Sequence, residues 1–297
     1  MEASSDHLRT LAAVVEHGTF DRAASALHLT PSAVSQRIKA LEELSGRVLV
    51  RRSKPILATQ AGAVLVRLAR QVALLEAEAA AELEGDDGAG RIAAPTSIPL
   101  VVNADSLATW VLPALATLPG SVFDIALDDQ EHTIGRLRDG TAMAAIGSDH
   151  EPVQGCTVSA LGAMRYRPLA SPGFLERWCP GGWDARAAAE APMLVYDRKD
   201  ALQDRYLARF ARGARPPRQY VPASTEFVGA AVLGLGWGMI PDLQAEAMLA
   251  DGRLVVLDED GAVDVPLYWQ QWSLQSAALG AVAGAIARAA AAALRPT

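Results

Sequence analysis

Thr30 and Pro31 impose the strongest local constraint in this sequence, because together they mark where a helix must begin. A threonine side chain accepts hydrogen bonds from first-turn amides, and a proline at the first helical position lacks only a donor that would stay unpaired. The predicted helix runs from Pro31 to about Leu44. Two shorter helical stretches precede it, over residues 6–17 and 19–27. Three helices in about forty residues predict a helix-turn-helix domain.

The outer face of the third predicted helix carries hydroxyl, amide and cationic side chains. Such groups hydrogen-bond base edges and phosphates from inside a DNA major groove. They are Ser32, Ser35, Gln36, Arg37 and Lys39. An alternating stretch over residues 48–50 leads to a basic tip with Arg51, Arg52 and Lys54, which predicts a wing against the DNA backbone or the adjacent minor groove. The alternative is a three-helix domain that binds protein and whose charges are only solvated.

The net charge of the chain is divided unevenly. All 297 residues together carry −7, which for the whole protein argues mildly against nucleic acid as a partner. Residues 1–60, however, hold eight basic and six acidic side chains, a net charge of +2, so residues 61–297 carry −9. A small basic head on a larger acidic body is typical of DNA-binding regulators.

A heptad pattern follows the wing. From Ala61 to Ala79 apolar residues recur at steps of 4, 3, 4, 3 and 4. Such a seam on a single helix predicts pairing with a second copy, and packing on its own domain is the alternative. A symmetric dimer places two recognition helices about 34–36 Å apart and reads an inverted repeat in double-stranded DNA. The predicted dimer contacts are Leu65, Leu68, Val72 and Leu75.

Beyond this helix, short apolar strands alternate with helical stretches, which is an α/β pattern. The Gly- and Asp-rich run EGDDGAGRIAAP breaks the helical pattern and marks a domain boundary. Ten candidate strands include separate ones at 156–161 and 166–171. We therefore expect an α/β chain with these parts: a winged helix-turn-helix domain (1–59), a dimerising linker helix (60–84), a hinge (85–95), and a domain (96–297) with two lobes, about 96–165 with 265–297, and 166–264.

The sequence predicts neither an enzyme nor an exported or membrane protein. The five histidines are scattered, and no G-x-S-x-G, H-E-x-x-H or Walker pattern occurs. Residues 234–238, GLGWG, have the wrong spacing and position for a dinucleotide loop. Cys156 and Cys179 make no disulfide framework, and a signal peptide is lacking. We expect a cytoplasmic protein without a cofactor, a metal or a membrane span.

The run AASALHLTPSAVSQRIKALEELSGRVLVRR resembles the N-terminal domain of LysR-type transcriptional regulators. The resemblance implies that the start of the third helix enters the major groove, which adds Thr30 and Pro31 to the DNA contacts, and that the wing extends to Thr59. It also implies pairing through the linker helix, further assembly into tetramers, nucleoid association, and contact with RNA polymerase. The C-terminal domain should be similar to a periplasmic binding protein, with an effector between its lobes.

Segments of the body resemble a narrower group, the ArgP and LysG regulators that respond to lysine and arginine. These segments are VNADSLATWVLPAL, LDDQEHT, PVQGCTVSALGAMRY, YDRKDALQD, GLGWGMIP and DVPLYWQQW. Members are also described as inhibitors of chromosome initiation. The resemblance implies a regulator that senses a basic amino acid and controls a LysE-type exporter or a related gene of amino-acid metabolism.

A basic amino acid brings two cations and one carboxylate, so its site needs acidic groups in two places and donors in a third. Predicted strand ends form an acidic rim that also includes Asp149 and Asp200, and helices beginning after Asn103 and near Ser224 can offer amides to a carboxylate. Each acidic residue singly can instead be a cap or a surface charge. The predicted effector contacts are Asn103, Asp105, Ser106, Asp128, Asp129, Glu131, Ser148, Asp197, Thr225 and Glu226.

We therefore expect lysine or arginine to bind between the lobes and to alter the spacing or bend that the DNA-binding heads impose. Two other classes stay open. One is a ligand-independent DNA-binding protein that inhibits chromosome replication initiation, and the other is an enzyme or transport binding protein built on the lobes. The preferred basic amino acid, activation or repression, and dimer or tetramer are not fixed by any motif.

Overall fold

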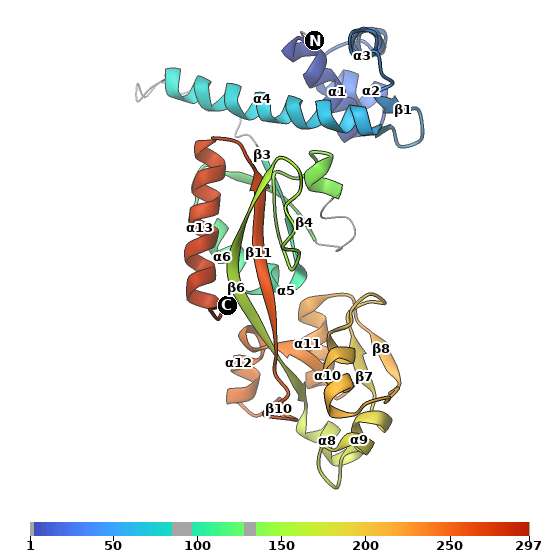
Figure 1. The fold of residues 1–297 in the computed structure, drawn as a ribbon, viewed down its shortest axis with the longest axis vertical. Helices are drawn as coiled ribbons and strands as arrows, with labels where there is room; N and C mark the ends of the chain where they lie inside the picture. Colours follow the sequence, from blue (N-terminus) through green and yellow to red (C-terminus); the bar gives the residue numbers. More distant parts are fainter. Residues whose placement is uncertain (1–2, 85–96, 128–134, 297) are drawn as a thin grey trace.

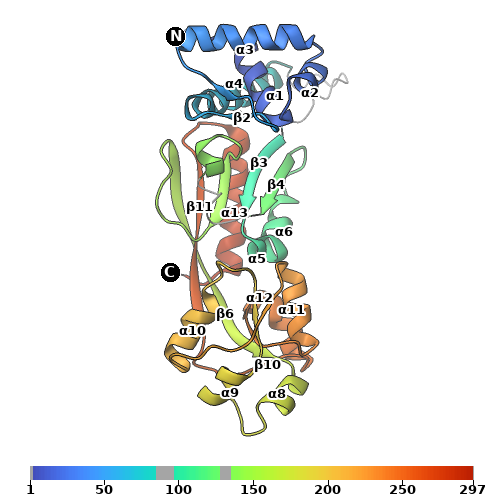
Figure 2. The ribbon, with the colours of Figure 1, turned by 90° about the vertical axis from the view of Figure 1, so that its right-hand side faces the viewer.

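The structure is a computed structural model that describes residues 3–84, 97–127 and 135–296. A small helical head and a long helix lie across one end of a two-lobed body (Figure 1). The view turned by 90° shows the same order, with the head above the first lobe and the second lobe at the far end (Figure 2). The predicted hinge at 85–95 lies outside the described residues.

The head contains the three predicted helices and a small wing. Its helices are α1 (Ser5–His17), α2 (Phe20–Ala26) and α3 (Pro31–Ser45). Thr19 and Thr30 cap α2 and α3, since their hydroxyls accept hydrogen bonds from backbone amides at 3.2 Å. Strands β1 (Val50–Arg51) and β2 (Leu57–Ala58) pair antiparallel. The predicted winged helix-turn-helix is therefore confirmed.

The linker helix α4 (Gln60–Glu84) begins inside the head. A Cβ on Gly62 would lie 1.9 Å from the carbonyl oxygen of Leu49, so only glycine allows α4 to pass this close to the wing. Leu65 is 6% exposed and packs with Val66 and Ala69 in the core of the head.

The predicted dimer seam therefore needs correction at Leu65, which its own domain buries. Leu68 and Leu75 stay exposed as predicted, and Val64, one residue before Leu65, is exposed beside them. The exposed apolar stripe contains Val64, Leu68 (38% exposed) and Leu75 (41% exposed), while Val72 is half-buried.

The first lobe is built on a sheet with a parallel centre. Strands β3 (Ser97–Val102), β4 (Val122–Leu127) and β5 (Ala144–Gly147) are parallel neighbours in the order β5-β3-β4. After β3 the chain turns into α5 (Ala104–Ser106), a π-helical stretch (Leu107–Val111) and α6 (Leu112–Leu115). Helix α13 (Ala277–Ala293) buries Leu279, Val282 and Ile286 in the same core.

The second lobe holds the small parallel pair β7 (Met193–Val195) and β8 (Arg218–Tyr220). The same lobe contains five helices: α8 (Pro172–Trp178), α9 (Ala185–Glu190), α10 (Leu202–Phe210), α11 (Ser224–Val232) and α12 (Asp242–Ala250). Strands β9 (Gly238–Pro241) and β10 (Val255–Val256) pair with β6, one of two long strands that enter from the first lobe.

Two long antiparallel strands connect the lobes. They are β6 (Cys156–Ala170) and β11 (Val263–Trp272). The sequence predicted two separate strands, at 156–161 and 166–171, in place of β6. The structure keeps one strand, since Gly162 has φ +128° and the register with β11 shifts beside it, as in a β-bulge.

The linker helix also packs on the first lobe through its other face. Leu74 is 2% exposed in the core of the body, and Arg70 donates to the carbonyl oxygen of Gly140. Glu78 Oε1 accepts hydrogen bonds from Ser276 Oγ (2.6 Å) and from the Ala278 amide (3.0 Å), which caps the start of α13. One face of α4 is thus occupied by its own body, and the stripe with Leu68 and Leu75 is left exposed.

Candidate functional site

A cavity of about 240 Å³ lies between the two lobes. Sites for drug-sized ligands span about 300–1,000 Å³, so this one suits a smaller molecule. It is lined from the first lobe by residues that follow β3 and β5, from the connecting strands by Tyr166, Val265 and Leu267, and from the second lobe by residues on the Tyr196–Gln203 segment and on α10, α11 and α12. The site therefore exists only because distant segments meet.

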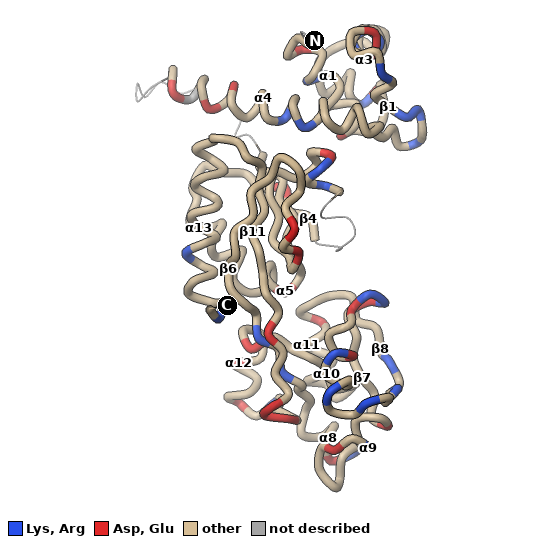
Figure 3. Tube along the Cα trace, viewed as in Figure 1, with Lys and Arg blue, Asp and Glu red and all other residues tan. Residues whose placement is uncertain are grey.

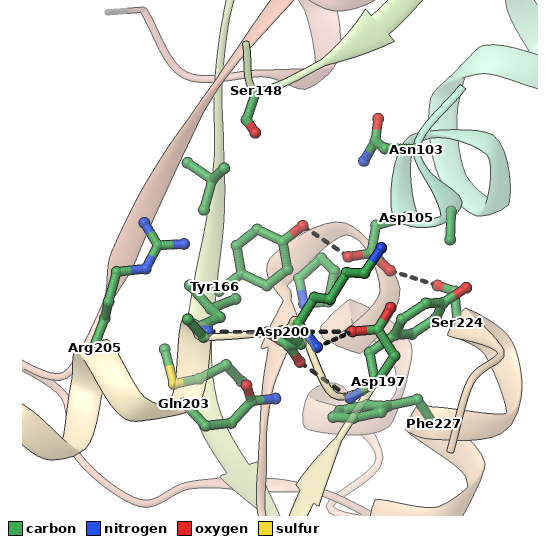
Figure 4. Close-up of a pocket in the computed structure, with 18 of the residues that line it drawn as sticks. Asn103, Asp105, Ser148, Tyr166, Asp197, Asp200, Gln203, Arg205, Ser224 and Phe227 are labelled. Carbon is green, nitrogen blue, oxygen red and sulfur yellow. Dashed lines mark hydrogen bonds between the residues drawn. The ribbon is translucent and has the colours of Figure 1, made fainter. Parts of the chain in front are cut away.

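Asp105 stands at the centre of this cavity (Figure 4). Its Oδ2 accepts a hydrogen bond from the Tyr166 hydroxyl at 2.7 Å, and its Oδ1 accepts one from Ser224 Oγ at 2.6 Å. Ser224 Oγ in turn accepts from Gln244 Nε2 at 2.8 Å. Because Asp105 belongs to the first lobe and Ser224 to the second, this carboxylate bridges the lobes.

Burial shifts the acid–base properties of this group. Desolvation raises the pKa of Asp105, against the hydrogen bonds from Ser224 and Tyr166, and the negative charge of Asp200 raises it further. Burial, together with the adjacent Asp105 carboxylate, raises the pKa of Tyr166 well above its usual range. A cation in the cavity would favour the ionised form of Asp105.

Two further carboxylates come from the turn between β7 and α10. Asp197 Oδ1 accepts from the amides of Lys199 (2.7 Å) and Asp200 (2.9 Å). Asp200 accepts from the amides of Tyr196 (3.0 Å) and Leu202 (2.9 Å). These bonds fix the orientation of both carboxylates at the wall of the cavity, where Lys199 and Arg205 supply cationic side chains nearby.

The structure brings together four of the predicted effector contacts. Asn103, Asp105, Ser148 and Asp197 line the cavity. Asp105, which could have been only a helix cap, bridges the two lobes. Asp128, Asp129 and Glu131 lie outside the described residues.

Three other predicted effector contacts do not line the cavity. Ser106 is fully buried behind it. Thr225 and Glu226 are exposed, since α11 begins at Ser224 and each later residue is turned by about 100°, so that Ser224 faces the cavity in their place.

Several lining residues were not among the predicted contacts. Tyr166 lies within a strand, and Gln203, Arg205 and Gln244 lie on helices where neither periodicity nor a motif distinguishes them from ordinary surface positions. Only the acidic rim and the helix starts after Asn103 and near Ser224 gave a signal in the sequence.

The predicted DNA-binding face of the head is largely exposed. Pro31, Ser32, Ser35, Gln36 and Lys39 form one exposed stripe along α3. The exposed side chains at the wing are Arg51, Arg52 and Lys54. Figure 3 shows basic residues at the wing and in the first half of α4, and acidic ones in its second half.

Three predicted DNA contacts are held by bonds within the protein. Thr30 Oγ1 caps α3. Thr59 Oγ1 donates to the Val48 carbonyl oxygen (2.7 Å) and accepts from the Gly62 amide (3.0 Å) at the start of α4. The Arg37 guanidinium donates to Thr10 Oγ1 (3.3 Å) and lies 3.5 Å from Asp6 Oδ2. Arg37 thus joins α3 to α1 in the structure.

Other classes of site find no support in the described part of the chain. None of its helices has both the length and the apolar character needed to cross a bilayer. Within the same residues, His, Cys, Asp and Glu side chains form no group able to hold a metal ion.

Comparison with known proteins agrees with this architecture. Residues 5–63 match the bacterial regulatory helix-turn-helix protein, lysR family, and residues 84–291 match the LysR substrate binding domain. The chain is 48% identical over 284 residues to the HTH-type transcriptional regulator LysG of Mycobacterium tuberculosis, covering 95% of this chain and 92% of that protein. It is 44% identical over 299 residues to the lysine export transcriptional regulatory protein LysG of Corynebacterium efficiens, with 97% and 98% covered.

A solved structure is similar over the same length. Full-length LysG from Corynebacterium glutamicum with bound effector Arg superimposes with a TM-score of 0.79 at 39% identity, covering 99% of this chain and all of that one. The chain belongs to the LysR family of bacterial transcriptional regulators. Since its relatives are transcriptional regulators, the expectation that it is not an enzyme is confirmed.

Proposed function

We propose that this regulator senses a basic amino acid, lysine or arginine, in the cavity between its lobes. The observation that carries the proposal is the gathering of Asp105, Asp197 and Asp200 around one small cavity. Carboxylates pair most strongly with ammonium and guanidinium groups that they can hydrogen-bond. Arg205 and the amides at the start of α11 offer the positive charge and donors that a ligand carboxylate needs.

The relatives support this choice of ligand. The Corynebacterium glutamicum protein was solved with Arg as its effector, and the Corynebacterium efficiens protein is named for lysine export. By analogy, this chain controls a gene for the export of basic amino acids or a related gene of their metabolism.

The second part of the proposal concerns DNA. The exposed stripe of α3 reads base edges in the major groove, and the wing contacts phosphates. The proposed base and phosphate contacts are Pro31, Ser32, Ser35, Gln36, Lys39, Arg51, Arg52 and Lys54. Arg37 acts through the packing of α3 on α1.

The third part concerns assembly and place in the cell. Two copies pair through the exposed stripe of α4 around Leu68 and Leu75, and a dimer of dimers follows from the family pattern. The dimer binds an inverted repeat, engages RNA polymerase at the promoter, and works in the cytoplasm at the nucleoid.

Calorimetry of the full chain tests the ligand. We expect heat with lysine or arginine and none with leucine or glutamate, and a complete lack of heat with lysine, arginine and histidine would exclude the proposal. Gel shifts with the chain's own promoter, with and without lysine or arginine, then separate a sensor from a ligand-independent DNA-binding protein, whose shift would not respond.

A further inference from the structure

Unpaired acceptors gather in the cavity. Six buried side-chain polar atoms in the described residues lack a hydrogen-bond partner, and three of them are amide oxygens. They belong to Asn103, Gln203 and Gln244, and all three residues line the cavity between the lobes. Buried acceptors are nearly always satisfied by protein groups or by bound water, so three in one cavity indicate that bound molecules with donors, water or a ligand, complete them.

Gln203 is the most telling of the three. It lies in the first turn of α10, and the residue is only 2% exposed. Figure 4 shows it at the wall of the cavity, below Asp200 in this view. Both carboxylate oxygens of Asp200 already accept backbone amides, whereas Gln203 Oε1 accepts none.

Gln270 provides an internal comparison. It is also buried, at 5% exposure, but its amide nitrogen donates to the carbonyl oxygens of Asp149 (3.0 Å) and Glu151 (3.1 Å), and its Oε1 accepts from the Val153 amide (3.4 Å). It does not line the cavity. Two buried glutamines of one chain therefore differ in whether the protein itself satisfies the amide oxygen.

We propose that Gln203 is a specificity-determining residue whose amide oxygen accepts a hydrogen bond from the ammonium or guanidinium group of the effector side chain. The inference rests on the proposed function and assigns one contact within it. A neutral acceptor at this position rewards a ligand with N–H donors and penalises an apolar side chain of similar length, which would leave the amide oxygen unpaired.

Removing the amide oxygen of Gln203 should weaken effector binding and stabilise the ligand-free protein. Gln203→Met keeps the size and removes the acceptor. We expect calorimetry to show at least tenfold weaker binding of arginine and lysine, while the ligand-free protein melts about 2–4 °C higher because an unsatisfied acceptor is gone. The matched variant Gln270→Met should melt lower and bind the amino acids as the wild type does.

A second variant keeps the test decisive if Gln203→Met perturbs the fold. Gln203→Glu retains an acceptor and adds a charge, so we expect a lower melting temperature without ligand and binding of arginine that is equal or tighter. Two results would overturn the assignment of Gln203 but leave the proposed function standing. One is wild-type affinity in Gln203→Met, and the other is a lower melting temperature together with weakened binding in both Gln203 variants. Failure of the wild-type protein to bind any basic amino acid would overturn the proposed function as well.

Discussion

The proposed DNA-binding face and the proposed effector cavity are built in opposite ways. The exposed stripe of α3 takes its side chains from two and a half turns of one helix, between Pro31 and Lys39. The cavity takes its side chains from segments between Asn103 and Leu267, contributed by both lobes and the strands between them. A local surface survives many changes elsewhere in the chain, whereas an assembled one depends on every element that places it.

The largest effect that separates the two sites is expected from Asp105→Asn. Removing the buried charge from its place opposite a cationic ligand should cost about 2–5 kcal/mol of binding free energy, because the ligand cation would be left without its counter-charge. Calorimetry with arginine measures the loss. Asp264→Asn, which breaks a more exposed pair with Arg165 outside the cavity, serves as the control. Equal affinities in the wild type and Asp105→Asn would remove the carboxylate from the site.

The same carboxyl predicts a pH dependence. Because burial raises the pKa of Asp105 in the ligand-free protein, protonation competes with the ligand cation as the pH falls. Affinity for arginine should decline toward acidic pH, and binding should release protons to the buffer. Titrations in buffers of different ionisation heat detect the release. Asp105→Asn should show neither the release nor the slope, and a slope that persists in this variant would point to another group.

Gln36→Ala and Lys54→Ala should affect specific and unspecific DNA binding differently. Loss of a base-reading amide is expected to cost about 1–3 kcal/mol on the specific site and little on unrelated DNA. Loss of a phosphate contact should weaken binding to both kinds of DNA. It should also reduce the slope of the logarithm of affinity against the logarithm of salt concentration by about one. Gel shifts over a salt series measure both. Identical losses on specific and unrelated DNA in Gln36→Ala would contradict a role in reading bases.

Contact between the linker helix and the first lobe can be tested at Gly140. A Cβ there would lie 2.7 Å from the Arg67 Cα, and the φ of +79° is strained for other residues. Gly140→Ala should cost about 1–3 kcal/mol of unfolding free energy. Gly120→Ala has the same backbone strain, at φ +82°, with no atom within 4 Å, and should cost less in denaturant titrations. Equal costs would show that the approach of α4 is not what Gly140 permits.

The smallest effect is expected at the cap of the recognition helix. Thr30→Ala removes the acceptor for the Ala33 amide, which should cost about 1 kcal/mol of stability. Specific DNA binding should fall modestly with it, while the affinity for arginine stays unchanged. Thr30→Ser, which keeps the hydroxyl, should restore both, as measured by thermal melting and gel shift.

The local surface of α3 could be predicted from the sequence more completely than the cavity, which is assembled from distant segments. The head was predicted nearly helix for helix, because Thr30 and Pro31 are local signals that act within a few residues. Even there, the burial of Leu65 was not predicted, because it depends on how closely α4 approaches the wing at Gly62.

The cavity was predicted only in part. The acidic rim identified Asp105 and Asp197, because carboxylates after strands are visible in a sequence. Gln203 and Gln244 were missed, because nothing in the sequence distinguishes a glutamine that lines a cavity from one on the surface of a helix. Contacts were predicted from Thr225 and Glu226, whereas Ser224 lines the cavity, because the sequence left the start of α11 uncertain by one residue.

The anchoring of Leu74 and Glu78 has a mechanical consequence. Because the linker helix is seated in the core of the first lobe and caps α13, the head, the linker and that lobe form a single lever arm. The second lobe is joined to this arm by β6 and β11, and it is the part of the chain that lies farthest from α3 (Figure 1). A movement between the lobes would therefore displace the second lobe relative to this arm and leave the contacts of α4 with the head and the first lobe in place.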